Sequence, residues 1–135
     1  MVTLLILDAF FKRELRGIEE VVQQTGEEYR LLSPWGAVVF LEKPRTDVAL
    51  VIADLDHRAL KVSDLLEKTT ANIILLSAEP LGKIYQKHPD LRTTGGGVFF
   101  QSKPPDMETF STLVKILLNL KRRRLSEQTY SGELA

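Results

Sequence analysis

Four short aliphatic runs constrain the fold of this chain most strongly, because none of them alternates with polar residues. A strand with apolar side chains on both faces must be covered on both faces, as in a parallel sheet between two layers of helices. The runs cover residues 4–7, 48–53, 72–76 and 98–100, and a weaker run over 29–32 suits an outer strand. We therefore expect a parallel sheet enclosed by helices.

Helical signals separate these runs. The spacing of apolar residues predicts helices over about residues 10–24, 35–42, 59–68, 81–87 and 106–124. The last is the longest, and Asp106, which follows two prolines, is its expected N-cap. Parallel strands need right-handed crossovers, here supplied by the intervening helices. The expected fold class is α/β: a flavodoxin-like (βα)5 three-layer sandwich with a parallel five-stranded sheet in the order 2-1-3-4-5.

Composition excludes several classes of protein. The chain has 135 residues, a size typical of one domain, and its 18 basic residues balance 18 acidic ones. Zero net charge argues against a nucleic-acid or membrane binder that acts through bulk charge. There is no cysteine, hence no disulfide framework, and no signal peptide or apolar stretch near the ~18 residues of a membrane span. We expect a soluble cytoplasmic protein.

Polar residues close four of the predicted strands. Asp8 follows the first, Asp54 and Asp56 the third, Ser77 the fourth and Lys103 the fifth. Because the carboxyl ends of parallel strands meet at one edge of the sheet, these side chains should converge there. A carboxylate can become an aspartyl phosphate, neighbouring acids can hold Mg²⁺, and a hydroxyl and a lysine can bind phosphoryl oxygens. One such Asp alone is more often a turn or cap residue, so the prediction depends on the whole set.

Over about residues 2–124 the sequence resembles the receiver domains of bacterial two-component response regulators. The motifs are Leu-Ile-Leu-Asp at 5–8, Val-Ile-Ala-Asp at 51–54, Leu-Leu-Ser-Ala-Glu at 75–79 and Lys-Pro at 103–104. The resemblance implies a phosphorelay signalling module rather than an enzyme. Its partner would be a histidine kinase or a phosphotransfer protein.

The resemblance also implies roles for single residues. Asp54 would be the phosphoacceptor, Ser77 the hydroxyl that senses the phosphoryl group, and Lys103 its counter-ion. Phe100 would couple phosphorylation to a face formed by the fourth helix, fifth strand and last helix, although a plain core role for this ring stays open. Mg²⁺ would be held by Asp8, Asp54 and the backbone carbonyl of Asp56.

Two features depart from the receiver pattern. Receivers usually carry consecutive acids after the first strand, whereas here Ala9 follows Asp8, so we expect weakened Mg²⁺ binding. The loop after Asp54 lacks the usual proline and glycine, and three glycines at 95–97 precede the last strand. Two versions therefore stay open: a phosphorylated receiver and a phosphate-independent pseudo-receiver that acts as a protein-interaction module.

A second alternative is a haloacid-dehalogenase-type phosphatase. Asp54 and Asp56 resemble its Asp-x-Asp signature, with Ser77 and Lys103 in place of its second and third motifs. Against it, that signature normally closes the first strand of the core, and two further metal-binding acids should follow the lysine. The receiver interpretation is preferred.

The last helix carries more apolar surface than one packed face requires. Leu113, Ile116 and Leu120 form its extra edge, which predicts either a homodimer seam or burial by this domain or an appended one. The four basic residues at 121–124 are interpreted as capping the helix rather than binding nucleic acid. We assign residues 1–124 to the receiver-like domain and 125–135 to a linker or the start of an output domain.

Overall fold

The structure of the protein is a computed structural model that describes residues 2–6, 12–40, 42, 47–55, 65, 69–92, 97–103 and 105–120. Its strands run parallel in one sheet, in the order β2-β1-β3-β4-β5. They are β1 (Val2–Ile6), β2 (Glu28–Leu32), β3 (Val48–Asp54), β4 (Asn72–Ser77) and β5 (Val98–Ser102). The predicted parallel sheet is therefore present.

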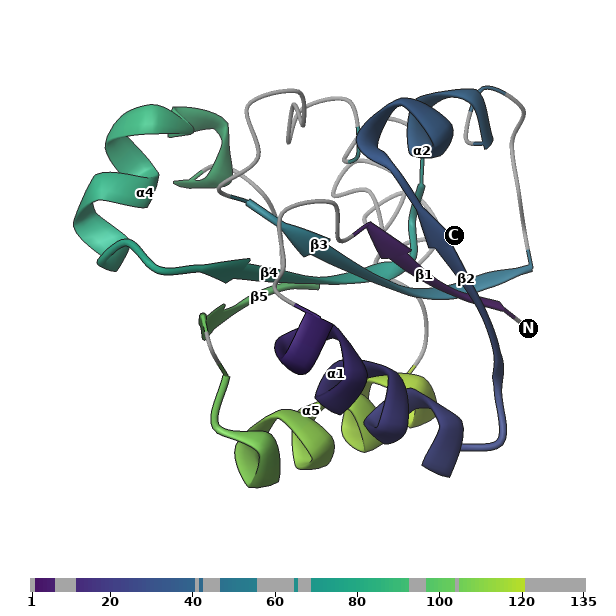
Figure 1. Ribbon diagram of the computed structural model, residues 1–135. Helices are drawn as coiled ribbons and strands as arrows, with labels where there is room; N and C mark the ends of the chain where they lie inside the picture. Colours follow the sequence, from purple (N-terminus) through teal and green to yellow (C-terminus); the bar gives the residue numbers. More distant parts are fainter. Residues whose placement is uncertain are drawn as a thin grey trace, which may run out of the picture.

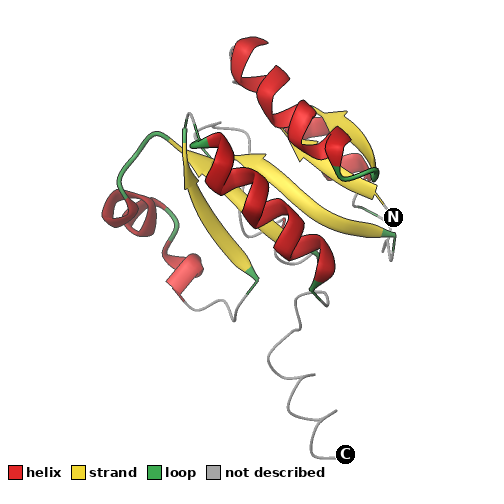
Figure 2. Ribbon diagram, turned by 90° about the horizontal axis from the view of Figure 1, so that it is seen from below, coloured by secondary structure: helices red, strands yellow, loops and turns green. Residues whose placement is uncertain are grey.

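Helices cover both faces of this sheet (Figure 1). Thirteen-residue helices α1 (Lys12–Gln24) and α5 (Met107–Asn119) lie on one face, as Figure 2 also shows. Seven-residue helices α2 (Pro34–Phe40) and α4 (Leu81–Lys87) lie on the other, and the 3₁₀ turn η1 (Pro89–Arg92) follows α4. The helix predicted over 59–68 falls outside the described residues except for Leu65, which is buried.

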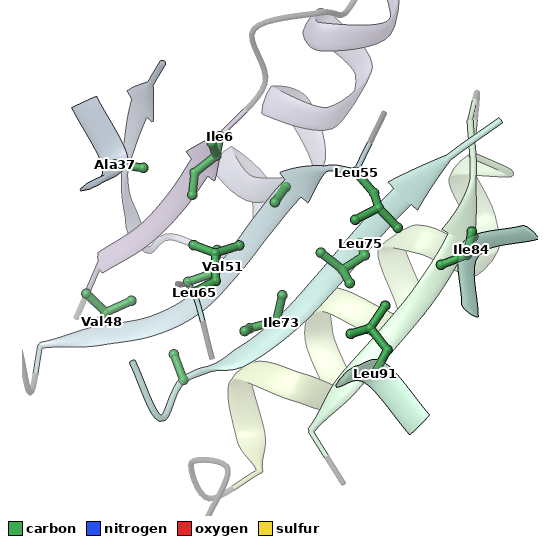
Figure 3. Packing of buried hydrophobic residues seen from close by; sticks show 12 residues of the cluster. Ile6, Ala37, Val48, Val51, Leu55, Leu65, Ile73, Leu75, Ile84 and Leu91 are labelled. Atoms are coloured by element: carbon green, nitrogen blue, oxygen red, sulfur yellow. The ribbon is translucent and has the colours of Figure 1, made fainter. Parts of the chain in front are cut away.

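Each face of the sheet has its own apolar core, as the non-alternating strands require. The α1/α5 core consists of Ile18, Val21, Val22, Leu50, Ile52, Ile74, Leu76, Phe110, Val114 and Leu117. The α2/α4 core is drawn in Figure 3 and consists of Ile6, Ala37, Val48, Val51, Ala53, Leu55, Leu65, Ala71, Ile73, Leu75, Ile84 and Leu91. Strands β3 and β4 supply residues to both cores and so form the rigid centre of the molecule.

Helix α5 begins as predicted but ends early. The Asp106 carboxylate accepts a hydrogen bond from the Thr109 N–H at 3.3 Å, the contact expected of an N-cap. The last helical residue is Asn119, and Leu120 has an extended backbone. The helix thus ends before Leu120, and residues 121–124 of the predicted helix lie outside the described residues.

Some other boundaries also differ from the sequence prediction. Helix α2 ends at Phe40 rather than at residue 42, and β1 begins at Val2 rather than at residue 4. Residue 7, the predicted end of the first strand, lies outside the described residues. Within the described parts of the chain, no helix is both long and apolar enough to cross a membrane.

Candidate functional site at the carboxyl edge of the sheet

Three of the predicted polar residues lie at the carboxyl ends of adjacent strands. Asp54 is the last residue of β3, Ser77 is the last residue of β4, and Lys103 directly follows β5. In the parallel register Asp54 lies beside Leu76, and Ser77 lies beside Ser102. The three strands therefore end nearly level, which brings a carboxylate, a hydroxyl and an ammonium to one edge.

Asp54 and Lys103 form a buried ion pair. The Lys103 Nζ donates to both carboxylate oxygens of Asp54, at 3.2 Å to Oδ1 and 3.0 Å to Oδ2. The Asp54 side chain is fully buried, and the Lys103 side chain is 14% exposed. A carboxylate removed from water in this way needs a charged or hydrogen-bonding partner, and Lys103 supplies one. The structure thus brings together two of the predicted site residues, which are 49 positions apart in the sequence.

The backbone beneath Asp54 is held firmly. Strand β3 is the middle strand of the sheet, and its residues from Leu50 to Asp54 are completely buried. The Leu55 N–H donates to the Leu76 carbonyl oxygen at 2.9 Å, which extends the β3–β4 ladder one residue beyond Asp54. The carboxylate therefore projects from a rigid strand end, as a positioned nucleophile requires.

Ser77 begins the loop that joins β4 to α4. Its side chain is buried, and its Oγ accepts a hydrogen bond from the Glu79 N–H at 3.1 Å. This local bond turns the chain away from the sheet towards α4. The predicted switch hydroxyl therefore lies on the strand next to Asp54, with its oxygen engaged by its own loop.

Phe100 connects β5 to α4. Its ring is half-buried and packs edge-to-face on Tyr85, with centroids 5.9 Å apart and an interplanar angle of 74°. Sequence reasoning named Phe100 but missed Tyr85. A usable signal was the aromatic residue next to Ile84, on a short helix that must pack beside the last strand.

An open pocket of about 450 Å³ lies between the β4–α4 loop, α4 and β5. Its wall combines apolar side chains with the hydroxyl and the ammonium of the site. It is lined by Ser77, Ala78, Glu79, Pro80, Leu81, Ile84, Phe100, Gln101, Ser102 and Lys103. The pocket gives the β4–α4 loop and the Phe100 ring open space on one side.

The remaining predicted metal ligands, Asp8 and Asp56, lie outside the described residues. Asp54 offers the hard carboxylate oxygens that Mg²⁺ prefers, but both are bonded to Lys103. Among the described residues no group of three or more His, Cys, Asp or Glu side chains could hold a metal ion. Ala9 has no ligand atom in its side chain, so a cation here would depend on Asp8 and Asp56 to complete its shell.

Fewer residues form the exposed apolar edge of α5 than the sequence predicted. Ile116 and Leu120 are 51% and 55% exposed. Leu113 is half-buried and packs against the α1/α5 core. The exposed apolar part of this edge therefore consists of Ile116 and Leu120.

Comparison with known proteins supports the fold. No protein-family model matches the chain, and no curated protein sequence matches it. Among solved structures, the chain is similar to the receiver domain from the hybrid histidine kinase CckA, with a TM-score of 0.58 and 22% sequence identity. The similarity covers 87% of this chain and 98% of that domain. The chain thus has the flavodoxin-like fold of receiver domains, and that prediction is confirmed.

Proposed function

We propose that this chain is a receiver module of two-component signalling that accepts a phosphoryl group on Asp54. The observation that carries the proposal is the Asp54–Lys103 ion pair at the carboxyl edge of a receiver-type sheet. Ser77 on the neighbouring strand supports it, because a hydroxyl at that position can bind an oxygen of the transferred group.

The proposed reaction is a phosphoryl transfer from a phosphohistidine of a kinase or phosphotransfer protein. An Asp54 carboxylate oxygen attacks phosphorus, the P–N bond breaks, and the imidazole nitrogen leaves and takes up a proton. Lys103 then stabilises the negative phosphoryl oxygens, and the Ser77 hydroxyl donates to one of them. The product is an aspartyl phosphate on this chain.

A divalent cation would assist this transfer by neutralising charge on the phosphoryl oxygens. Asp8, Asp54 and the backbone carbonyl of Asp56 would hold Mg²⁺, and weak binding is expected because Ala9 provides no further carboxylate. Lys103 carries a larger share of the charge neutralisation here than it would in a site with consecutive acids.

The residues that line the pocket would carry the effect of phosphorylation away from Asp54. Withdrawal of Ser77 towards the phosphoryl group would move the β4–α4 loop and change the packing of Phe100 on Tyr85. Because Tyr85 belongs to α4, the expected output face comprises α4, β5 and α5. The exposed Ile116 and Leu120 are the proposed contacts with a second copy of the chain.

A phosphate-independent pseudo-receiver is the second candidate. It is favoured by Ala9 and by the complete burial of Asp54, both of whose oxygens are bonded to Lys103. In that case the same fold would act through protein contacts alone, and Lys103 would serve as the permanent partner of a buried carboxylate.

Incubation with acetyl phosphate, with and without Mg²⁺, followed by intact mass measurement separates the candidates. A receiver gains one phosphoryl group, and Asp54→Ala does not. Failure to gain it under forcing conditions contradicts the first candidate and supports the second. Sustained hydrolysis of a generic phosphate ester would instead support a phosphatase of the haloacid-dehalogenase type.

A further inference from the structure

Glu79 joins the site to helix α4 through two separate contacts. Its backbone N–H donates to the Ser77 Oγ at 3.1 Å. Its carboxylate forms an ion pair with the Lys87 Nζ. Lys87 is the last residue of α4, so this pair spans the whole helix and ends at the residue that holds the Ser77 oxygen.

Helix α4 has one buried side chain among its seven residues. Its N-cap is Pro80, which makes no side-chain capping hydrogen bond, and its first turn contains no acidic residue. Ile84 is its buried residue, and Tyr85 packs on Phe100. A seven-residue helix with one buried side chain depends on its surface contacts for its exact position.

We propose that Lys87 is a positioning residue that, through Glu79, holds the β4–α4 loop in the resting conformation. In this conformation the Ser77 oxygen accepts from the Glu79 N–H. The step rests on the proposed function, in which Ser77 and the β4–α4 loop move towards the phosphoryl group. The Glu79–Lys87 pair therefore opposes activation, and its strength sets how readily the loop leaves the resting state.

The size of the effect follows from exposure. The side chains of Lys87 and Glu79 are 60% and 34% exposed, so water and salt screen much of their attraction. For pairs of this kind the equilibrium changes by at most about fivefold when the charge is removed. Such a factor adjusts a population without abolishing the fold, as expected of a positioning contact.

Amide hydrogen exchange at Glu79 in the unphosphorylated full chain tests the proposal. Lys87→Gln should lower protection of this amide by up to about fivefold, and high salt should bring the wild type close to the variant. Lys87→Arg should keep the protection. Lys83→Gln removes the same charge from the same helix and should leave the protection of the Glu79 amide unchanged. The protection of the amides within β4 should be the same in every variant.

A charge exchange makes the test specific to the pair. Glu79→Lys combined with Lys87→Glu should recover protection that either single change loses. Equal protection in wild type and Lys87→Gln would overturn the proposal, and so would an equal loss in Lys83→Gln. On treatment with acetyl phosphate, Lys87→Gln should form the Asp54 adduct faster. Absence of any adduct in the wild type, with the exchange result as expected, would refute the proposed function while the positioning role stands.

Discussion

The two faces of the sheet are built differently. On one face α1 and α5, with thirteen residues each, bury Ile18, Val21, Val22, Phe110, Val114 and Leu117. On the other face α2 and α4 have seven residues each. Among the residues whose side chains the structure describes, α2 contributes Ala37 and α4 contributes Ile84 to the buried core. The α1/α5 face is thus a fixed foundation, while α4 can shift at low cost.

The proposed site lies where these two kinds of structure meet. Asp54 belongs to the rigid central strand and is fixed by the buried pair with Lys103. Ser77 leads directly into the β4–α4 loop, whose ion pair between Glu79 and Lys87 is largely exposed. A signalling site needs this combination, because the reacting carboxylate must stay in place while the neighbouring loop responds.

The largest expected effect on the free energy of unfolding tests the α1/α5 core. Phe110→Ala should lower the free energy of unfolding by about 3–5 kcal/mol, because a fully buried ring leaves a cavity that α5 cannot close. Ile84→Ala should cost only about 2 kcal/mol, since α4 can move into the space. Urea denaturation of both variants provides the comparison, and a larger loss for Ile84→Ala would show that the two faces do not differ in this way.

The next effect concerns the buried ion pair. Lys103→Met should cost about 3 kcal/mol, because the buried Asp54 carboxylate loses its charged partner. Adding Asp54→Asn should recover much of this loss, since the uncompensated charge is then absent. The four stabilities form a double-mutant cycle, and simple additivity would mean that the pair contributes nothing.

A smaller effect sharpens the account of α5. Asp106→Ala should cost about 1 kcal/mol, because the Thr109 N–H loses its capping acceptor. Asp106→Ser should retain most of the stability, as serine also caps helices well. Thermal or urea unfolding measures both. Equal losses in the two variants would show that capping is not the cause.

The smallest effect on stability belongs to the exposed edge of α5. Ile116→Lys with Leu120→Lys should each change the free energy of unfolding by less than about 0.5 kcal/mol, since both side chains are about half exposed. In sedimentation, the wild type should nevertheless be a dimer and the double variant a monomer. Trp35→Lys with Val39→Lys, on the exposed face of α2, is the control that should leave the mass unchanged. A monomeric wild type would contradict the proposed self-association.

Much of the fold and part of the site could be predicted because they follow from local patterns and one topological rule. Non-alternating strands indicate a parallel sheet, and parallel strands bring their carboxyl ends together, which places Asp54 near Lys103. Tyr85 and the Glu79–Lys87 pair could not be found this way. Their contacts depend on how α4 packs against β5 and against the β4–α4 loop. The eight-residue spacing of Glu79 and Lys87 also differs from the three- or four-residue spacing of side-chain pairs within one helix. The end of α5 at Asn119 was missed because apolar residues at helical spacing continue to Leu120.

The central claim is that Asp54 carries the phosphoryl group, and borohydride reduction tests it directly. An aspartyl phosphate formed with acetyl phosphate is reduced to homoserine, whose position peptide mass measurement identifies. The account predicts homoserine at position 54 of the wild type and none in Asp54→Asn treated in parallel. Homoserine at a different position, or an unmodified residue 54 in protein that has gained phosphoryl mass, would contradict it.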